Sequence, residues 1–321
     1  MKRRSALSLT GCVVAGYAMS GIAQTQRVMR LGNLSIFPVS TDEQWRQAMH
    51  ARGWEVGRNL VVERRFTMGI PGRLASLANE LVSAHVDVIM AEGDYAALAA
   101  FNATRTIPIV MHGTAPVEMG LAQSLARPGG NVTGIVYYAD GYAGKQLEII
   151  RAIQPALKRM GFPMLPNVLP LKVVLAGWTA IAEKMGVTMV ELPWPMTVAD
   201  IDSTLAAALR ERVQAFEFTF NPALRGAGWQ QITAWAVSNK VLTSAAEYAR
   251  GEAAFTFGAN GPRFRDQIFD QIDRVLRGAN PAEMPIQRPT LFDIVINRKI
   301  IQAMGLTVPR SVLLQATEVI D

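Results

Sequence analysis

The sequence predicts an α/β protein of two Rossmann-like lobes, each a parallel sheet with helices on both faces, joined by hinge strands. Short β-rich runs alternate with amphipathic helical patterns from residue 28 onward, and a Pro-Gly-Gly turn divides them into two series. Such alternation favours parallel strands linked by crossover helices. With 321 residues, 50% of them hydrophobic and 18% charged, the chain is long and apolar enough for two folded cores.

The first series alternates four predicted strands with three helices. The second helix starts at Ile70-Pro71, where proline suits a first turn, and repeats apolar residues at helical spacing along one face. We therefore expect that face to cover the sheet. The apolar face of the second helix holds Leu74, Leu77, Ala78 and Leu81. The first helix is capped by Thr41 or Asp42, and the third spans residues 95–103. The predicted strands are residues 28–36, 59–66, 86–91 and 107–111.

The segment 124–134 predicts a short helix, a tight turn and a strand that begins at Asn131. Pro128 cannot continue a helix, and Gly129 and Gly130 tolerate positive φ angles. Because the turn follows the fourth strand and precedes the second series, we predict that the chain crosses between the lobes here.

The second series predicts a second lobe over residues 137–258, after which the chain returns. The first lobe then comprises residues 28–136 plus 259–321, with a long helix at 264–277 and a strand at 292–297 that rejoins the first sheet. Hinge strands are expected near 134–138, near 257–259 and at a third crossing closer to the C-terminus. The predicted strands of the second lobe are 160–164, 187–191, 215–220, 241–243 and 253–258, and its helices are 144–153, 172–185, 198–210 and 229–239.

Residues 1–23 have the pattern of an export signal. Lys2, Arg3 and Arg4 precede an apolar run without charge, and Gly21 and Ala23 are small residues at the positions a signal peptidase reads. We expect cleavage after Ala23 and a periplasmic mature protein. A short buried helix is the alternative for residues 5–19.

A lipoprotein site at residues 9–12 is the other alternative, but the apolar run continues beyond Cys12 instead of closing there. Cys12 is the only cysteine, so a chain cleaved after Ala23 has no thiol or disulfide. Removal of three positive and no negative residues lowers the formal net charge from +6 to about +3, and nothing suggests a nucleic-acid surface.

Several segments together resemble the substrate-binding proteins of bacterial ABC transporters, in the group related to tryptophan- and tyrosine-binding lipoproteins. The resemblance covers nearly all of residues 28–320. It implies a fold like that of type I periplasmic binding proteins, a small-molecule solute, ABC permease membrane subunits as partners, a monomer, and no cofactor. The matching segments are residues 53–63, 86–89, 106–110, 124–134, 289–297 and 305–309.

In open parallel sheets, ligands bind beyond the carboxyl ends of the strands. The first lobe offers Ser35 after its first strand, Gly93, Asp94 and Tyr95 after its third, and Thr114 after its fourth. Amides at a helix N-terminus favour a carboxylate or phosphate. Asp94 either caps the helix or holds an ammonium group, and Ser35 is either a ligand contact or a satisfied hydroxyl at a strand end.

The second lobe is predicted to contribute Tyr137, Asn221 and Glu247, together with Tyr138 and Asp140. Adjacent strand residues point to opposite faces, so one of the two tyrosines is expected to pack inward. Aromatic side chains at a cleft suit flat or apolar ligands.

Two loops depart from the family pattern. Ile36, Phe37 and Pro38 stand where relatives carry small polar residues, and Tyr95 stands where they carry a small one. Both changes narrow the pocket or make it more apolar. The resemblance suggests an amino acid or an aromatic compound, but the relatives' ligand does not transfer directly.

The sequence lacks a catalytic or metal-binding set. His50, His85 and His112 are dispersed, and no nucleophile elbow, P-loop or dinucleotide fingerprint occurs. Of the three histidines, only His112 is expected near the cleft. We expect it to form structural hydrogen bonds there and not to act as a catalyst. The leading hypothesis is a non-catalytic receptor that captures a solute by hinge closure; the alternatives are a periplasmic α/β enzyme using His112 and a ligand-binding subunit of a sensory system.

Overall fold

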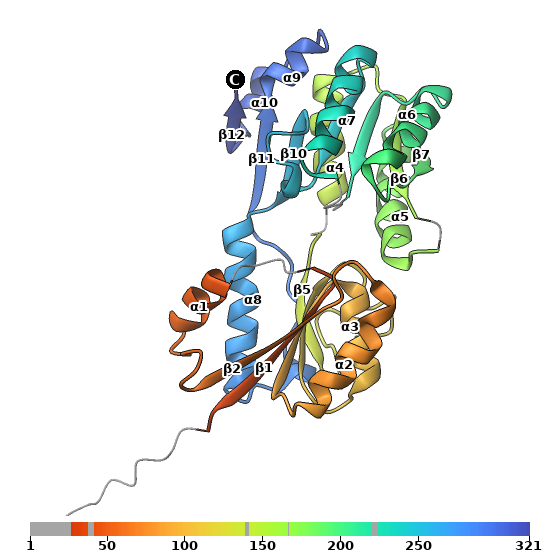
Figure 1. Cartoon of the computed structure of the whole chain (residues 1–321). Coiled ribbons are helices and arrows are strands. Elements are labelled where there is room, and N and C mark those ends of the chain that lie inside the picture. Colours follow the sequence, from red (N-terminus) through yellow and green to blue (C-terminus); the bar gives the residue numbers. More distant parts are fainter. Residues whose placement is uncertain (1–26, 38–41, 139–140, 166, 220–223) are drawn as a thin grey trace, which may run out of the picture.

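A computed structural model describes residues 27–37, 42–138, 141–165, 167–219 and 224–321. The chain folds into two lobes stacked end to end, each built around one sheet with helices on both faces (Figure 1). The sheet orders are β2-β1-β3-β4-β5 and β12-β11-β10-β9-β8-β6-β7. The α/β class and the two-lobed architecture predicted from the sequence are therefore confirmed.

All strands of the first sheet are parallel. Helices α1 and α8 cover one face and α2 and α3 the other. The four residues predicted to form the apolar face of the second helix are all buried. The elements are β1 (Met29–Ser35), α1 (Asp42–His50), β2 (Leu60–Phe66), α2 (Leu74–Ser83), β3 (Val88–Glu92), α3 (Asp94–Ala103), β4 (Ile109–Gly113), β5 (Val132–Val136) and α8 (Gly261–Leu276).

The sequence predicted that the Pro-Gly-Gly turn is the crossing between the lobes, and this prediction is wrong. It precedes β5, at the opposite end of that strand from the crossing, and the residues before Pro128 form a loop instead of a helix. Gly129 has a φ of +75°, whereas Gly130 is not among the described residues with positive φ. The motif starts β5, whose Gly134 is required because a Cβ there would lie 1.8 Å from the carbonyl oxygen of Met111.

The second sheet is mixed: β10 and β11 pair antiparallel, and its other described neighbours are parallel. Helices α4 and α5 pack with one apolar cluster, and α6 and α7 with another. The elements are α4 (Tyr142–Ile153), β6 (Arg159–Met164), α5 (Leu169–Lys184), β7 (Thr188–Pro193), α6 (Ile201–Arg210), β8 (Ala215–Phe218), α7 (Ala227–Asn239), β9 (Leu242–Ala245), β10 (Phe255–Ala259), β11 (Phe292–Asn297), α9 (Arg298–Ala303), α10 (Arg310–Leu313) and β12 (Glu318–Ile320).

The proline-rich stretch near residue 163 forms a strand despite Pro163. Pairing between β6 and β8 covers only Met160 and Gly161, so Pro163 lies beyond that ladder. On its other side Pro163 stands opposite Leu192 of β7. A proline near the end of a strand, past one of its two ladders, removes no hydrogen bond that the sheet needs.

The prediction that residues 292–297 rejoin the first sheet is wrong. β11 pairs with the whole of β10, from Phe255 opposite Ile296 to Ala259 opposite Phe292. Phe257 stacks on Phe292 with a centroid distance of 5.3 Å. Of the segment 259–321 assigned to the first lobe, α8 packs on the first sheet, but residues 292–320 complete the second.

Three stretches connect the lobes (Figure 1). One leads from β5 to α4, another from β10 to α8, and the third runs from Gln287 to β11. Gln287 pairs with β5: the amide of Val136 donates to its carbonyl oxygen at 2.9 Å, and its own amide donates to Gly134 at 2.8 Å. The first and third crossings therefore start side by side.

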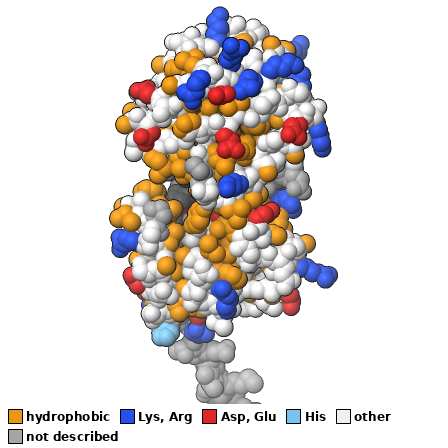
Figure 2. Space-filling model, turned by 90° about the vertical axis from the view of Figure 1, so that its right-hand side faces the viewer, with side chains coloured by type: hydrophobic (Ala, Val, Ile, Leu, Met, Phe, Trp, Pro, Cys, Tyr) orange, Lys and Arg blue, Asp and Glu red, His pale blue; other side chains and the backbone are white. Residues whose placement is uncertain are grey.

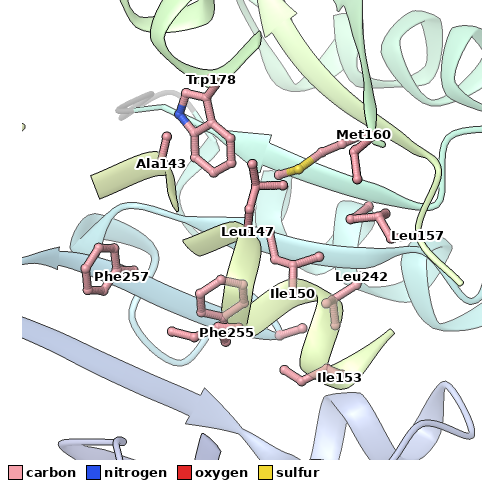
Figure 3. Packing of buried hydrophobic residues seen from close by; sticks show 14 of the residues in the cluster. Ala143, Leu147, Ile150, Ile153, Leu157, Met160, Trp178, Leu242, Phe255 and Phe257 are labelled. Atoms are coloured by element: carbon pink, nitrogen blue, oxygen red, sulfur yellow. The ribbon is translucent and has the colours of Figure 1, made fainter. Parts of the chain in front are cut away.

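The core of the second lobe forms beneath α4 and α5 (Figure 3). Trp178 of α5 and Leu147 of α4 are almost entirely buried and pack with Met160 of β6. This core fixes α5 against α4 and so places one wall of the cavity described below. Within the described ranges, no helix is both long and apolar enough to cross a membrane.

Candidate functional site between the lobes

A cavity of about 330 Å³ lies where the two lobes meet. Figure 2 shows hydrophobic side chains gathered around this waist. The first lobe contributes the loop after β4, and the second contributes the start of α4 and one side of α5. The lining residues are Thr114, Pro116, Val117, Glu118, Leu125, Val136, Tyr138, Gly141, Tyr142, Ala143, Val173, Val174, Gly177, Trp178, Ile181 and Arg288.

Asp94 connects the two loops of the first lobe that border the cleft. Its Oδ1 accepts hydrogen bonds from the amides of Thr114 at 2.8 Å and Ala115 at 2.9 Å. Burial raises the pKa of Asp94, and these amide hydrogen bonds oppose that rise. Gly113 makes room for this carboxylate, since a Cβ there would lie 2.8 Å from Oδ1. Asp94 therefore has a structural role that the sequence did not predict: its carboxylate binds backbone amides of the loop after β4, and α3 has no side-chain cap hydrogen bond.

Gly93 precedes α3 with a φ of 98° and a ψ of 155°. Residues with a side chain rarely adopt this conformation, so glycine is required by the backbone here. A Cβ at Gly93 would meet no atom within 4 Å. The space above the first turn of α3 is therefore open. Tyr95, in the same turn, is 40% exposed.

Ser35 is buried and its hydroxyl donates to the carbonyl oxygen of Phe37 at 2.6 Å. Its neighbour across the ladder is Glu92, whose Oε1 accepts from Asn33 Nδ2 at 3.0 Å. Burial raises the pKa of Glu92 to about 7, against the hydrogen bonds of Asn33 and Ser35 and the charge of Arg64. Ser35 is thus a satisfied hydroxyl at a strand end, one of its two predicted roles.

His112 lies at the end of β4, buried, with Nδ1 2.6 Å from the hydroxyl of Tyr137. Phe264 of α8 stacks on Tyr137 and contacts the histidine ring edge to face. Burial lowers the pKa of His112 to about 4, so the imidazole is neutral at physiological pH. The structural role expected for this histidine fits its geometry.

Tyr137 and Tyr138 separate as strand alternation predicts. Tyr137 packs against the first lobe through His112 and Phe264, whereas Tyr138 lines the cavity and contacts Tyr142 at a centroid distance of 4.7 Å. The hydroxyl of Tyr142 donates to the carbonyl oxygen of Phe257 at 2.6 Å. The first crossing therefore presents Tyr138, not Tyr137, to the cavity.

Among the predicted site residues that the structure describes, Thr114 and Tyr138 line the cavity. Gly93, Asp94, Tyr95 and Ser35 lie together at the carboxyl ends of β1 and β3, beside it. Asn221 and Asp140 fall outside the described residues, as does the side chain of Glu247. α5 contributes a further part of the lining, and none of its residues was predicted.

Sequence reasoning missed the wall formed by α5. Val173, Val174, Gly177, Trp178 and Ile181 recur at helical spacing and line the cavity together. That spacing also suits a buried face, so it does not by itself mark a binding site. Arg288 of the third crossing was also missed.

A buried carboxyl in the second lobe was likewise not predicted. Glu217 of β8 is 1% exposed and accepts hydrogen bonds from Gln146 Nε2 at 3.1 Å and from the Ser244 hydroxyl. Burial raises its pKa to about 8, despite these hydrogen bonds. Glu217 is therefore mostly protonated at neutral pH.

A larger groove of about 650 Å³ lies on the outside of the second lobe, between α5 and β7. Lys172, Glu183 and Glu191 line it together with small and apolar residues. Since its walls belong to one lobe, movement between the lobes does not close it.

Comparison with known proteins agrees with this architecture. The model of the family described as ABC transporter substrate binding protein matches residues 42–320. A curated tyrosine-binding protein from Clostridioides difficile is 36% identical over 116 residues, which are 36% of this chain and 33% of that protein. The match thus spans about a third of that relative's length.

Two solved structures align over 91% of this chain at 25% identity. A conserved domain protein from Vibrio cholerae superimposes with a TM-score of 0.81 over its whole length. An ABC domain from Streptococcus pneumonia, in complex with L-Trp, superimposes with a TM-score of 0.79 over 99% of its length. With most of its length matched by the family model, the chain belongs to the ABC transporter substrate binding protein family.

Proposed function

We propose that this protein is the extracytoplasmic receptor of an ABC importer. In this account it captures a small solute in the cavity between its lobes and closes around it by bending at the three crossings. The ligand supplies the driving force, because tighter binding to the closed form shifts the open–closed equilibrium. The closed form then delivers the solute to the membrane permease.

The observation that carries the proposal is the origin of the cavity walls. Thr114 comes from the first lobe, Trp178 from the second and Tyr138 from a crossing between them. A ligand held there touches both lobes and the segment about which they move. Closure would bury it further, which is how two-lobed receptors gain affinity.

The lining favours a ligand with an apolar or aromatic body. Half-buried Tyr138 offers a ring surface, while Tyr142 and Trp178 belong to the lining but are buried. Arg288 and Glu118 are the charged residues of the lining. We propose an amino acid or an aromatic compound. The relatives named for tyrosine and crystallised with L-Trp support this class.

We propose that the solute is bound without chemical change. His112, the histidine that the sequence places beside the cleft, is buried, neutral and directed at Tyr137. Replacement of His112 by glutamine should weaken binding only modestly, by about 0.5–1.5 kcal/mol for one hydrogen bond. An acid–base catalyst would instead lose about a hundredfold in rate or more.

We further propose that the protein acts as a monomer in the periplasm after removal of residues 1–23. The basic start and uncharged apolar run of that segment support export. Intact-mass measurement of exported protein tests this: a chain beginning at Gln24 is expected, and a lipid adduct on Cys12 would show anchoring instead.

A thermal-shift screen of the mature protein against amino acids, aromatic acids and nucleobases tests the proposed function. A ligand at a hundredfold its dissociation constant should stabilise the folded state by about 2.7 kcal/mol. Calorimetry should then give one site per chain, and mass spectrometry should recover the ligand unaltered. Absence of any stabilising solute, or turnover that vanishes in His112→Gln, would reject the receptor function.

A further inference from the structure

Helix α5 carries a glycine, Gly177, near its middle. Glycine is a poor helix former, because it loses more backbone freedom than other residues when the helix forms. Its φ is not positive, and a Cβ built on it meets no atom within 4 Å. Neither backbone conformation nor close packing within the described structure therefore requires glycine at this position.

Gly177 faces the cavity between the lobes. It lies there with Val174, Trp178 and Ile181 of the same helix, which are one turn or one residue away. Thr114 and Val117 contribute to the lining from the first lobe. A side chain at position 177 would extend into this space, so the missing side chain enlarges the cavity on its apolar α5 side.

We infer that Gly177 determines the size of solute that the receptor accepts, an inference that rests on the proposed function. The part of the solute that lies against α5 occupies the volume that a side chain at 177 would fill. Because the neighbours there are aliphatic and aromatic, this part is an apolar group of ring size. The polar part of the solute then lies toward Thr114 and the crossings.

Ala176 offers a matched control on the same helix. It is exposed and lines the outer groove, not the cavity between the lobes. Ala176→Leu therefore adds an apolar side chain to α5 without changing the cavity. Gly177→Ala adds one methyl group toward the cavity, and Gly177→Leu adds a branched chain.

The test measures melting temperatures and calorimetric affinities of the wild type and these three variants with L-tryptophan, L-tyrosine, L-leucine and benzoate. We expect all variants to melt at or above the wild-type temperature, because the new side chains meet empty space and favour the helix. Gly177→Leu should weaken the best-bound probe at least tenfold, Gly177→Ala less, and Ala176→Leu less than twofold. The loss should grow with the size of the probe's apolar group.

The outcomes separate the two proposals. If no probe binds the wild type, the proposed function fails for this solute class and the inference fails with it. If a probe binds the wild type and Gly177→Leu equally well, only the inference is overturned. It is also overturned if Gly177→Leu melts well below Ala176→Leu, since the space beside Gly177 would then not be empty.

Discussion

The carboxylate of Asp94 accepts a hydrogen bond from the amide of Thr114 at 2.8 Å, which ties the first turn of α3 to the loop after β4. A second bond from the amide of Ala115 completes the connection. Both loops border the cleft, and Thr114 lines the cavity. The shape of the first lobe's binding edge thus depends on one buried carboxylate.

Replacement of Asp94 by alanine should destabilise the protein by about 1–3 kcal/mol, because two buried amides lose their acceptor. Asp94→Asn keeps one side-chain oxygen and should cost less. Chemical denaturation of the two variants measures both effects. Equal stability of Asp94→Ala and wild type would show that this connection does not stabilise the fold.

Gly93→Ala should lower stability by about 1–3 kcal/mol, because its φ of 98° is strained for any residue with a Cβ. Space does not limit the substitution, since no atom lies within 4 Å of the new Cβ. Gly177→Ala is the matched control, with an equally open Cβ direction but no positive φ. Denaturation midpoints that fall equally for both glycines would contradict the backbone argument.

Stability should depend on pH through Glu217. Burial raises its folded-state pKa to about 8 from an ordinary value of 4.5, so between these values the folded protein holds a proton that the unfolded chain releases. The free energy of unfolding therefore falls as pH rises from about 4.5 to 8. Glutamine at this position cannot ionise, and Glu217→Gln should remove this contribution.

Urea denaturation of wild type and Glu217→Gln at pH 5.5 and pH 8.5 measures the difference. The wild type should lose at least about 1.4 kcal/mol relative to the variant over this range, the value of one pKa unit. Glu92, with a pKa of about 7, also lowers the free energy of unfolding as pH rises, but it does so equally in both proteins and cancels in their difference. His112 acts in the opposite direction below pH 6.5 and cancels too. Parallel pH curves would contradict a buried, protonated Glu217.

Local features of the fold could be predicted from the sequence. The apolar face of α2 follows from spacing within ten residues, and all four of its predicted residues are buried. The partner of β11 could not be predicted in this way. An apolar strand such as Phe292–Asn297 suits either sheet, and its place between β10 and β12 depends on contacts between distant segments.

The site, too, was predicted only where local sequence features determine it. Strand ends located Asp94 and Thr114 near the cleft, because the carboxyl ends of parallel strands share one edge of a sheet. Whether Asp94 faces a ligand or a backbone amide depends on side-chain directions that spacing does not encode. Buried carboxyls such as Glu92 and Glu217 stand in apolar runs with no local signal of their partners.

Closure of the two lobes around a bound solute is the central claim. The chain from Gln24 onward has no cysteine, so Ser76→Cys on α2 and Ser203→Cys on α6 place one label on each lobe. Both serines are exposed and each replacement is conservative. Titration of a solute from the screen should change the energy transfer between the labels. The dissociation constant from this titration should equal the one measured by calorimetry. Unchanged transfer at a saturating concentration of a solute that calorimetry shows to be bound would contradict the account.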